Sequence, residues 1–278
     1  MKYVIEKEWL LNKLNDSDVR IADCRFKLGS PKEGHSLYSL NHIPNAIYFD
    51  LEKDLSGKVK EHGGRHPLPD LEQLKHALEK AGISRETTVV AYDGGEGAFA
   101  SRFWWLLRYL GHEKVYILNG GYKEWINGEY PVSNEIQSYE PAIFNIELQH
   151  DILAPYEEVK SQSENYGGAV LIDSREAKRY LGLEEPIDKK AGHIPGAINK
   201  VWLEAYENGR FHDIQDQEKR FAEIDKNKPV IVYCGSGVTA APNFLALIEA
   251  GYSNVKLYAG SFSDWISYED NEIETVEK

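Results

Sequence analysis

The stretch PVIVYCGSGVTAAPNFLALIEAGY, at residues 229–252, decides the fold of this chain. A short apolar run ends at Cys234, a loop of small and polar residues follows, and then comes a second apolar segment that closes at Gly251. Pro242 lies where the first turn of a helix would tolerate proline, and a glycine is the usual residue after a helix ends. The stretch therefore predicts a buried β-strand, a tight loop and an α-helix.

Four segments of the chain occur twice, in the same order. The pairs are IADCR (21–25) with LIDSR (171–175), NHIPNAI (41–47) with GHIPGAI (192–198), TVVAYDGG (88–95) with PVIVYCGS (229–236), and YLGHEKVYILNGGYKEW (109–125) with EAGYSNVKLYAGSFSDW (249–265). The first copy carries extra residues, for which EHGGRHPLPD (61–70) is the obvious insertion. We predict two copies of one domain, at residues 1–133 and 150–278, joined by a polar linker at 134–149.

Each copy alternates short apolar runs with amphipathic segments such as DLEQLKHALEKAG (70–82) and SRFWWLLRYLG (101–111). Strands that alternate with helices are typical of a parallel sheet covered on both faces. The predicted class is therefore α/β, with two tandem domains of this kind. In such sheets, functional residues gather where strands end and helices begin.

The composition excludes several kinds of partner. The formal charge of the 278 residues is −13, and no basic tail is present, which argues against nucleic-acid binding. No run approaches the roughly 20 apolar residues of a membrane span, and the N-terminus lacks a signal-peptide core. Two cysteines do not make a disulfide framework, so we expect a reducing, cytoplasmic setting. No His/Cys cluster has metal-ligand spacing, so neither a metal nor an organic cofactor is expected.

The loop after the predicted strand is suited to a reactive thiol. Gly235 and Gly237 allow backbone angles that let successive N–H groups converge, and the following helix presents its own unpaired N–H groups there. Such a cradle stabilises the thiolate of Cys234 and would hold an anionic adduct formed on it. The first copy has Asp93 in this place, which indicates one active and one degenerate domain. Cys24 aligns with Ser174 and is expected to be a small packing residue.

Three reactions use a cysteine in an anion cradle. Hydrolysis of a phosphate ester needs an arginine six residues after the cysteine, where this chain has Ala240. Thiol–disulfide exchange needs a resolving cysteine, and the sequence has no C-x-x-C. Attack on sulfur to form a persulfide needs only the thiolate and N–H donors, and we favour it. The alternative is a structural cysteine that ends a core strand.

Three motifs carry a resemblance to a known family. CGSGVTA (234–240), GHIPGA (192–197) and DSREAKRYLG (173–182) resemble the two-domain rhodanese-type sulfurtransferases, most of all the 3-mercaptopyruvate sulfurtransferases. The resemblance implies two tandem rhodanese-like domains, of which only the C-terminal one is catalytic. It implies a persulfide on Cys234, fed by a small-molecule sulfur donor and discharged to a thiol, a thioredoxin-like protein or cyanide.

The resemblance also assigns roles to single residues. Arg179 matches the arginine that contacts the substrate carboxylate, and Ser236 and His42 match a proposed catalytic pair. The remaining loop residues would surround the bound sulfur: Gly235, Gly237, Val238, Thr239 and Ala240. The chain departs from the family at Ile187 and Asp188, where mercaptopyruvate enzymes often have a second arginine. Lys189 or Lys190 would be the local substitutes, although a lysine is not a bidentate clamp.

Several alternatives stay open at this point. His42 has a counterpart, His193, in the other copy, so both can equally be structural turn residues. The uncharged loop favours mercaptopyruvate, a monoanion, over the dianion thiosulfate, but a thiosulfate:cyanide sulfurtransferase (rhodanese) remains the alternative enzyme. The third hypothesis, from a different class, is a non-catalytic persulfide carrier or partner-binding module.

Overall fold

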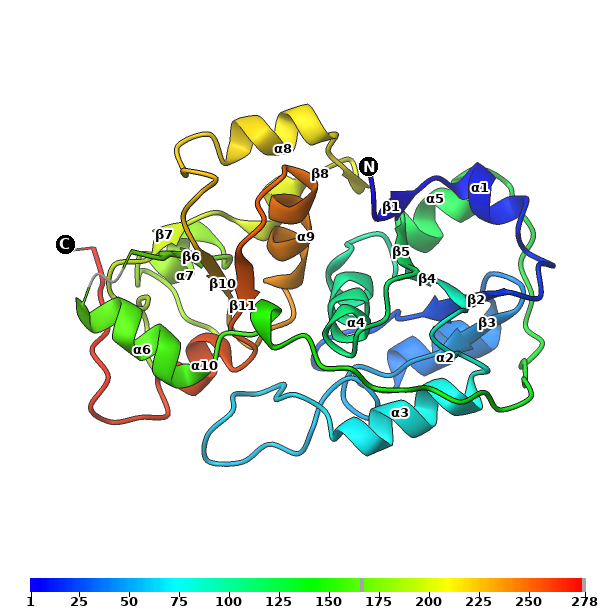
Figure 1. Cartoon of the computed structure of the whole chain (residues 1–278), viewed down its shortest axis with the longest axis horizontal. Coiled ribbons are helices and arrows are strands. Elements are labelled where there is room, and N and C mark those ends of the chain that lie inside the picture. The colour runs from blue at the N-terminus through cyan, green and yellow to red at the C-terminus, as the bar shows by residue number, and fades with distance from the viewer. Residues whose placement is uncertain (166–167, 277–278) are drawn as a thin grey trace. The chain divides into compact units, whose positions relative to one another are not determined.

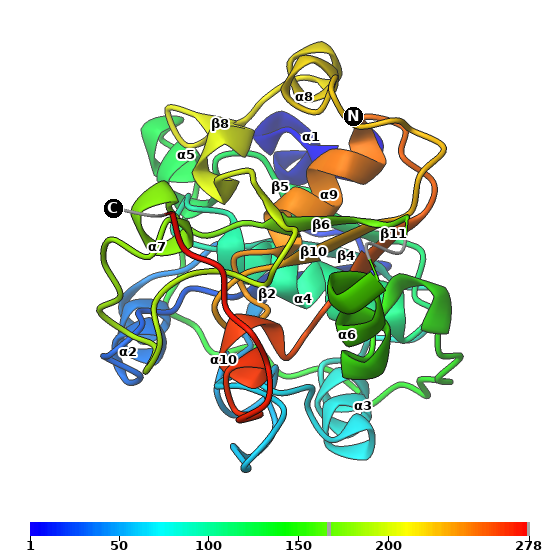
Figure 2. The same cartoon turned by 90° about the vertical axis from the view of Figure 1, so that its left-hand side faces the viewer.

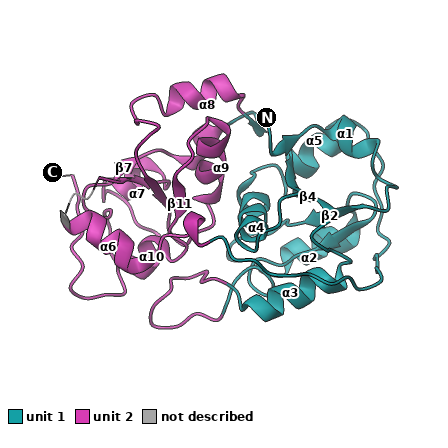
Figure 3. Ribbon diagram, viewed as in Figure 1, with its two compact units in different colours: residues 1–57, 69–149, 206–211 teal, residues 58–68, 150–205, 212–278 magenta. Residues whose placement is uncertain are grey.

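A computed structural model of the chain describes residues 1–165 and 168–276, which form two compact units (Figure 3). The first unit contains residues 1–57, 69–149 and 206–211, and the second contains residues 58–68, 150–205 and 212–278. The two short segments 58–68 and 206–211 each belong to the unit opposite to the one that the sequence copies suggest. Residues 134–149, the expected linker, contain no helix or strand and belong to the first unit.

The first unit is built on a parallel sheet of five strands in the order β1-β5-β4-β2-β3 (Figure 1). The strands are β1 (Val4–Ile5), β2 (Val19–Asp23), β3 (Ala46–Tyr48), β4 (Thr88–Tyr92) and β5 (Val115–Leu118). The helices are α1 (Lys7–Leu11), α2 (Glu33–Leu40), α3 (Leu71–Lys80), α4 (Ala98–Tyr109) and α5 (Gly121–Asn127). The two segments that the sequence predicts as helices, 70–82 and 101–111, form α3 and α4.

Both faces of this sheet are buried, as its apolar strands require. One face packs Ile21, Val90 and Leu118 against Tyr38 of α2 and Trp125 of α5. The helix α4 contacts β4 and β5, and nearly all of its side chains are buried. A helix that is apolar on most sides is one that lies in the interior of a domain.

The second unit contains a parallel sheet of four strands in the order β11-β10-β6-β7. The strands are β6 (Val170–Asp173), β7 (Ile198–Asn199), β10 (Val230–Tyr233) and β11 (Val255–Leu257). The helices are α6 (Tyr156–Asn165), α7 (Ala177–Tyr180), α8 (Ile214–Arg220), α9 (Ala241–Glu249) and α10 (Ser261–Trp265), with short 3-10 turns η1 (His150–Ile152) and η2 (Trp202–Ala205). The remaining strands, β8 (Tyr206–Glu207) and β9 (Arg210–Phe211), pair as an antiparallel hairpin that belongs to the first unit.

The helices of the second unit cover both faces of its sheet. Figure 2 shows α9 on one side of the strands and α6 and α10 on the other. Ile231 and Tyr233 of β10 pack with Val159 of α6 and Trp265 of α10. Pro242 lies in the first turn of α9, as predicted. The cysteine loop is therefore fixed between a fully buried strand and a buried helix.

The two sheets repeat one topology, which confirms the predicted α/β fold. Strands β5-β4-β2-β3 correspond in order to β11-β10-β6-β7, and Leu153 bridges Leu257 at the edge where the first unit has β1. In each unit a buried arginine donates hydrogen bonds from Nε and Nη2 to the aspartate that ends a strand. The pairs are Arg25 with Asp23 and Arg175 with Asp173. Within the described part of the chain, no helix is both long enough and apolar enough to cross a bilayer.

Candidate active site

Cys234 lies directly after β10 and is held on both sides. Its side chain is only 1% exposed, and its Sγ accepts the N–H of Gly237 at 3.1 Å. Its own N–H donates to the Ser261 hydroxyl at 3.1 Å, and its carbonyl accepts the N–H of Phe262 at 2.9 Å. The first turn of α10 therefore fixes the cysteine backbone, while the loop directs an N–H group at the sulfur.

The two loop glycines serve different purposes. Gly237 has φ +75°, and a side chain there would collide with the carbonyl group of Ala259. The φ of Gly235 lies outside the left-handed region, so the expectation that both glycines supply backbone freedom is wrong for this one. A Cβ at Gly235 would instead lie 2.8 Å from Nη2 of Arg65. Gly235 is small because a guanidinium group occupies the space of its side chain.

Two guanidinium groups flank the loop at Gly235. Arg179, on α7, has its Nη2 3.4 Å and its Nη1 3.6 Å from the position that a Cβ would take. Arg65 comes from segment 58–68, which belongs to the same unit. The loop carries no charged side chain of its own, but two guanidinium groups lie beside it in the folded chain.

Segment 58–68 is fastened to α10 through its backbone. The N–H of Gly63 donates to Oδ1 of Asp264 at 2.6 Å, and the N–H of Arg65 donates to the Ser263 hydroxyl at 3.1 Å. Gly63 and Gly64 both have positive φ, and a side chain on Gly64 would collide with the backbone at Gly260. The GGR sequence thus permits a close approach that places one arginine beside the cysteine loop.

Acidic side chains balance these cations. Nε of Arg179 lies 3.1 Å from each carboxylate oxygen of Glu185, and its Nη2 lies 2.8 Å from Oδ2 of Asp188. Asp188 also forms an ion pair with Arg65. Burial lowers the pKa of Arg65, and the neighbouring charge of Arg179 acts in the same direction. Lys189 and Lys190 are exposed, so the second cation beside the loop is Arg65 and not one of these lysines.

The partner of Ser236 is His66, not His42. The Ser236 hydroxyl lies 2.8 Å from Nδ1 of His66, and both residues are buried. In the first unit, the ring nitrogens of His42 lie 2.7 Å from the carbonyl oxygen of Tyr38 and 3.1 Å from that of Glu135. Main-chain oxygens therefore engage both nitrogens of His42, which favours the structural alternative and leaves its catalytic role an unsupported prediction.

His193 in the second unit supports the structural alternative. Its Nδ1 lies 2.7 Å from the carbonyl oxygen of Tyr180, and its ring stacks on Tyr180 with centroids 3.8 Å apart. His42 makes the same two contacts with Tyr38, at 2.7 Å and 4.1 Å. A contact that both copies keep is one that the fold needs, so these histidines are structural turn residues.

The rest of the loop leads into α9. The Val238 carbonyl accepts the N–H of Ala241 at 3.2 Å, and the Ala240 carbonyl accepts that of Phe244 at 3.0 Å. Val238 and Ala240 are buried, and Thr239 is half-buried. Their contact with a bound sulfur atom stays a prediction.

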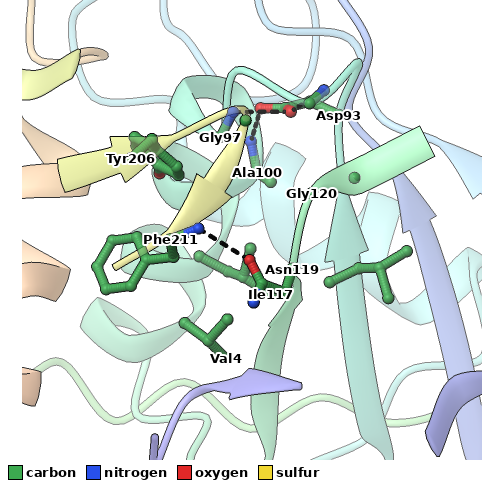
Figure 4. Close-up of a pocket in the computed structure, with 13 residues that line it drawn as sticks. Val4, Asp93, Gly97, Ala100, Ile117, Asn119, Gly120, Tyr206 and Phe211 are labelled. Carbon is green, nitrogen blue, oxygen red and sulfur yellow. Dashed lines mark hydrogen bonds between the residues drawn. The ribbon is translucent and has the colours of Figure 1, made fainter. Parts of the chain in front are cut away.

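The corresponding loop of the first unit holds a carboxylate instead of a thiol. Oδ1 of Asp93 accepts the N–H groups of Gly95 at 3.0 Å and Gly97 at 2.9 Å, and Oδ2 accepts those of Phe99 at 3.0 Å and Ala100 at 3.2 Å. Figure 4 shows Asp93 with Gly97 and Ala100. The other cysteine of the chain, Cys24, is buried in this unit, and burial followed by the charge of Asp23 raises the pKa of its thiol. Cys24 is the packing residue that the sequence predicted.

The sequence reasoning missed Arg65 and His66. Both lie in EHGGRHPLPD, which the repeat comparison marks as extra residues of the first copy. The available signal was the combination of two glycines with an arginine and a histidine in an insertion within an acidic chain. What it lacked was a reason to place this segment beside the cysteine of the second copy.

Comparisons with known proteins agree with this fold. Residues 6–127 and 156–268 both match the family model of the rhodanese-like domain. The chain therefore belongs to the rhodanese-like family, with two such domains in tandem, and this confirms the predicted family and fold.

Relatives in this family narrow the class further. The chain is 39% identical over 270 residues to a probable 3-mercaptopyruvate sulfurtransferase of Pseudomonas aeruginosa, with 95% of each chain covered. It is 32% identical to the 3-mercaptopyruvate sulfurtransferase of Escherichia coli K12, with 99% and 98% covered, and 32% identical to the bovine thiosulfate sulfurtransferase, with 94% and 91% covered.

A solved structure gives the same result. The crystal structure of SseA from Escherichia coli, described as a 3-mercaptopyruvate sulfotransferase, matches 95% of this chain and all of its own with a TM-score of 0.85 at 31% identity. The predicted enzyme class, a rhodanese-type sulfurtransferase that acts on a small-molecule donor, is confirmed at this level. The relatives differ in the donor that their names state.

Proposed function

We propose that this protein is a 3-mercaptopyruvate sulfurtransferase with Cys234 as its nucleophile. The observation that carries the proposal is the position of the Cys234 sulfur, which accepts the Gly237 N–H at 3.1 Å in a loop flanked by two guanidinium groups. The names of the Pseudomonas and Escherichia coli relatives support the same donor.

In the first half-reaction, the Cys234 thiolate attacks the sulfur atom of 3-mercaptopyruvate. The S–S bond forms as the C–S bond of the donor breaks, and the electron pair of that bond passes into the enolate of pyruvate. The proton of the donor thiol ends on the enolate carbon, which gives pyruvate and leaves a persulfide anion on Cys234. Atoms and charge balance without an external oxidant or a cofactor.

Arg179 and Arg65 would hold the donor carboxylate. Arginine binds carboxylates through paired, charge-assisted hydrogen bonds, and both guanidinium groups lie where a side chain at Gly235 would be. A carboxylate bound there places the neighbouring carbons and the thiol of the donor over the loop. This positioning converts an encounter between two anions into an oriented reaction.

Ser236 and His66 are suited to move the proton. Their hydrogen bond of 2.8 Å gives the Ser236 hydroxyl an imidazole partner, a group that commonly acts as a general acid or base. The backbone N–H groups of the loop from Gly235 to Ala240, together with the Thr239 hydroxyl, would hold the outer sulfur of the persulfide. N–H groups aimed at a developing anion stabilise it without reorganisation.

The second half-reaction returns the enzyme to its starting state. A thiol, a thioredoxin-like protein or cyanide attacks the outer sulfur, and the Cys234 thiolate leaves. These acceptors are compatible with the cytoplasmic setting that the two unpaired cysteines favour.

Thiosulfate is the second candidate donor. The sequence argument against it was the absence of charge in CGSGVTA, but two guanidinium groups face that loop in the folded chain. The bovine relative named thiosulfate sulfurtransferase supports this candidate too. Steady-state kinetics with both donors and cyanide decides between them through the ratio of the two kcat/KM values.

The test is an intact mass measurement on the reduced, desalted protein after brief exposure to each donor. We expect a gain of one sulfur atom with 3-mercaptopyruvate, no gain in Cys234→Ser, and an undiminished gain in Cys24→Ser. Absence of the gain with both donors would refute the proposal. A gain without multiple turnover on thiols or cyanide would instead support a persulfide carrier.

A further inference from the structure

The carboxylate of Asp188 takes an unusual place beside the cysteine loop. Its side chain is only 3% exposed, and its two oxygens bind different arginines: Oδ2 lies 2.8 Å from Nη2 of Arg179, and Oδ1 pairs with Nη1 of Arg65. These are the arginines that surround the side-chain position of Gly235. A carboxylate of this chain therefore already bridges the two groups that would bind the carboxylate of a donor.

Glu185 holds Asp188 in this position. Oε1 of Glu185 accepts the N–H groups of Ile187 at 3.0 Å and Asp188 at 2.9 Å, so the turn that carries Asp188 closes on a buried carboxylate. Glu185 also binds Nε of Arg179. A third arginine, Arg175, lies 3.2 Å from Oε2 of Glu185 and is itself paired with the aspartate that ends β6. The cluster therefore contains three guanidinium groups and three carboxylates, and its formal charge is zero.

The orientation of the guanidinium groups leaves one end of each for a ligand. Arg65 turns Nη1 to Asp188 and places Nη2 nearest to Gly235. Arg179 binds the two carboxylates through Nε and Nη2, and its Nη1 lies 3.6 Å from the position of a Cβ at Gly235. A donor anion thus meets N–H groups of two arginines whose charge is already compensated. Such a site offers paired hydrogen bonds to one carboxylate but little excess charge for a dianion.

We propose that Asp188 determines the donor preference of this site by neutralising the arginine pair, so that a monoanionic donor is favoured over a dianionic one. This inference rests on the proposed sulfurtransferase function. It assigns a role to a position where the sequence has an acid in place of a further cation.

The test compares Asp188→Asn with the wild type in two assays at one pH and ionic strength. The first measures kcat/KM for thiosulfate and for 3-mercaptopyruvate with cyanide as the acceptor. Because the substitution leaves one unit of arginine charge uncompensated, we expect the thiosulfate to mercaptopyruvate ratio to rise about fivefold or more. The second assay, which needs no turnover, measures how well sulfate and pyruvate protect Cys234 from alkylation by iodoacetamide. In Asp188→Asn, the protection by sulfate should increase more than the protection by pyruvate.

Two control variants accompany it. Asp188→Glu keeps the charge and should keep the ratio close to that of the wild type. Glu184→Gln removes an exposed carboxylate of the same segment, which pairs with Lys178, and should change neither assay. If Asp188→Asn does not fold, the wild type alone still tests the inference, because sulfate should protect Cys234 less well than pyruvate.

The outcomes separate the two proposals. If the wild type takes up no sulfur from either donor, the proposed function fails. If the wild type transfers sulfur while Asp188→Asn leaves both ratios unchanged, the function stands and the role of Asp188 is refuted. Equal protection of the wild type by sulfate and pyruvate would also refute it.

Discussion

The loops after β4 and β10 occupy the same place in two copies of one domain, and both direct backbone N–H groups inward. They differ in the side chain that accepts these N–H groups. In the first unit the Asp93 carboxylate fills the loop and accepts four backbone N–H groups. Burial still raises the pKa of Asp93, and the N–H groups oppose that shift. In the second unit the uncharged-looking loop surrounds a sulfur atom. The fold thus builds a loop with inward N–H groups in both units, filled by a carboxylate in the first and holding a thiol in the second, where we propose the chemistry.

The two loops also differ beside the glycine that follows Asp93 or Cys234. A Cβ at Gly94 would lie 2.8 Å from a carboxylate oxygen of Glu96, whereas one at Gly235 would lie 2.8 Å from a guanidinium nitrogen of Arg65. A carboxylate group therefore lies beside the first cradle, and a guanidinium group lies beside the second. We therefore expect that a thiol in the cradle is not sufficient for sulfur transfer and that the flanking arginines are also required.

The largest effect should come from transferring the thiol between the copies. We expect Asp93→Cys combined with Cys234→Ala to take up no sulfur from either donor, because Glu96 repels the donor anion and supplies no hydrogen bond to it. Intact mass after exposure to donor measures this. The matched control is Cys234→Ala alone, and sulfur uptake by the double variant but not by this control would show that the cradle suffices.

Removing the inserted cation should have the next largest effect. We expect Arg65→Ala to lower kcat/KM for 3-mercaptopyruvate about 10²-fold, mainly through KM, because one of the two carboxylate-binding groups is lost. Arg65→Lys keeps the charge without the planar fork and should recover only part of the loss. Steady-state kinetics measures both.

The matched control for Arg65 is Lys60→Ala, an exposed cation of the same segment. It changes the net charge by the same amount and should leave kcat/KM within about twofold of the wild type. If the two alanine variants lose activity equally, Arg65 acts only through the net charge of the protein. The guanidinium group beside Gly235 would then not explain why the two loops differ.

The sequence predicted the fold and the nucleophile for a physical reason. Strand periodicity, helix signals and the small residues after Cys234 are local properties, and the internal repeat ordered them into two domains. The site around the cysteine depends on a segment more than 160 residues earlier in the chain, since Arg65 and His66 reach Gly235 and Ser236 only through tertiary contacts. Local patterns do not contain that pairing, so the sequence offers only His42, through the family resemblance, as a partner for Ser236.

His42 and His66 allow a smaller, more selective test. We expect His66→Gln to lower kcat about tenfold, to match Ser236→Ala, and to add little when combined with it, because the two residues act as one unit. His42→Gln should instead lower the thermal stability, since its ring packs on Tyr38 in the core, while the folded variant keeps its kcat. If His42→Gln lowered kcat while His66→Gln lowered only the stability, His42 and not His66 would be the functional partner of Ser236.

Ser261 gives the smallest expected effect and the sharpest comparison of the two copies. Its φ is +57°, and its counterpart Gly121 has φ +56°. A side chain at Gly121 would come within 2.6 Å of the Asp93 carbonyl oxygen, so the first unit excludes one. The second unit keeps a serine in this strained region, and its hydroxyl accepts the N–H of Cys234 at 3.1 Å and lies 3.9 Å from the sulfur.

The Ser261 hydroxyl also donates to the Tyr258 carbonyl at 2.9 Å, so a glycine would lose two hydrogen bonds. We expect Ser261→Gly to change the free energy of unfolding by no more than about 1 kcal/mol, because relief of the left-handed strain offsets these losses. The transfer rate should nevertheless fall about threefold, since the cysteine backbone loses its brace. Ser261→Ala keeps the strain and loses the hydroxyl, so it should be less stable than the glycine variant. Denaturant unfolding and kcat measure both, and an unchanged kcat in Ser261→Gly would mean that the strained serine serves only the fold.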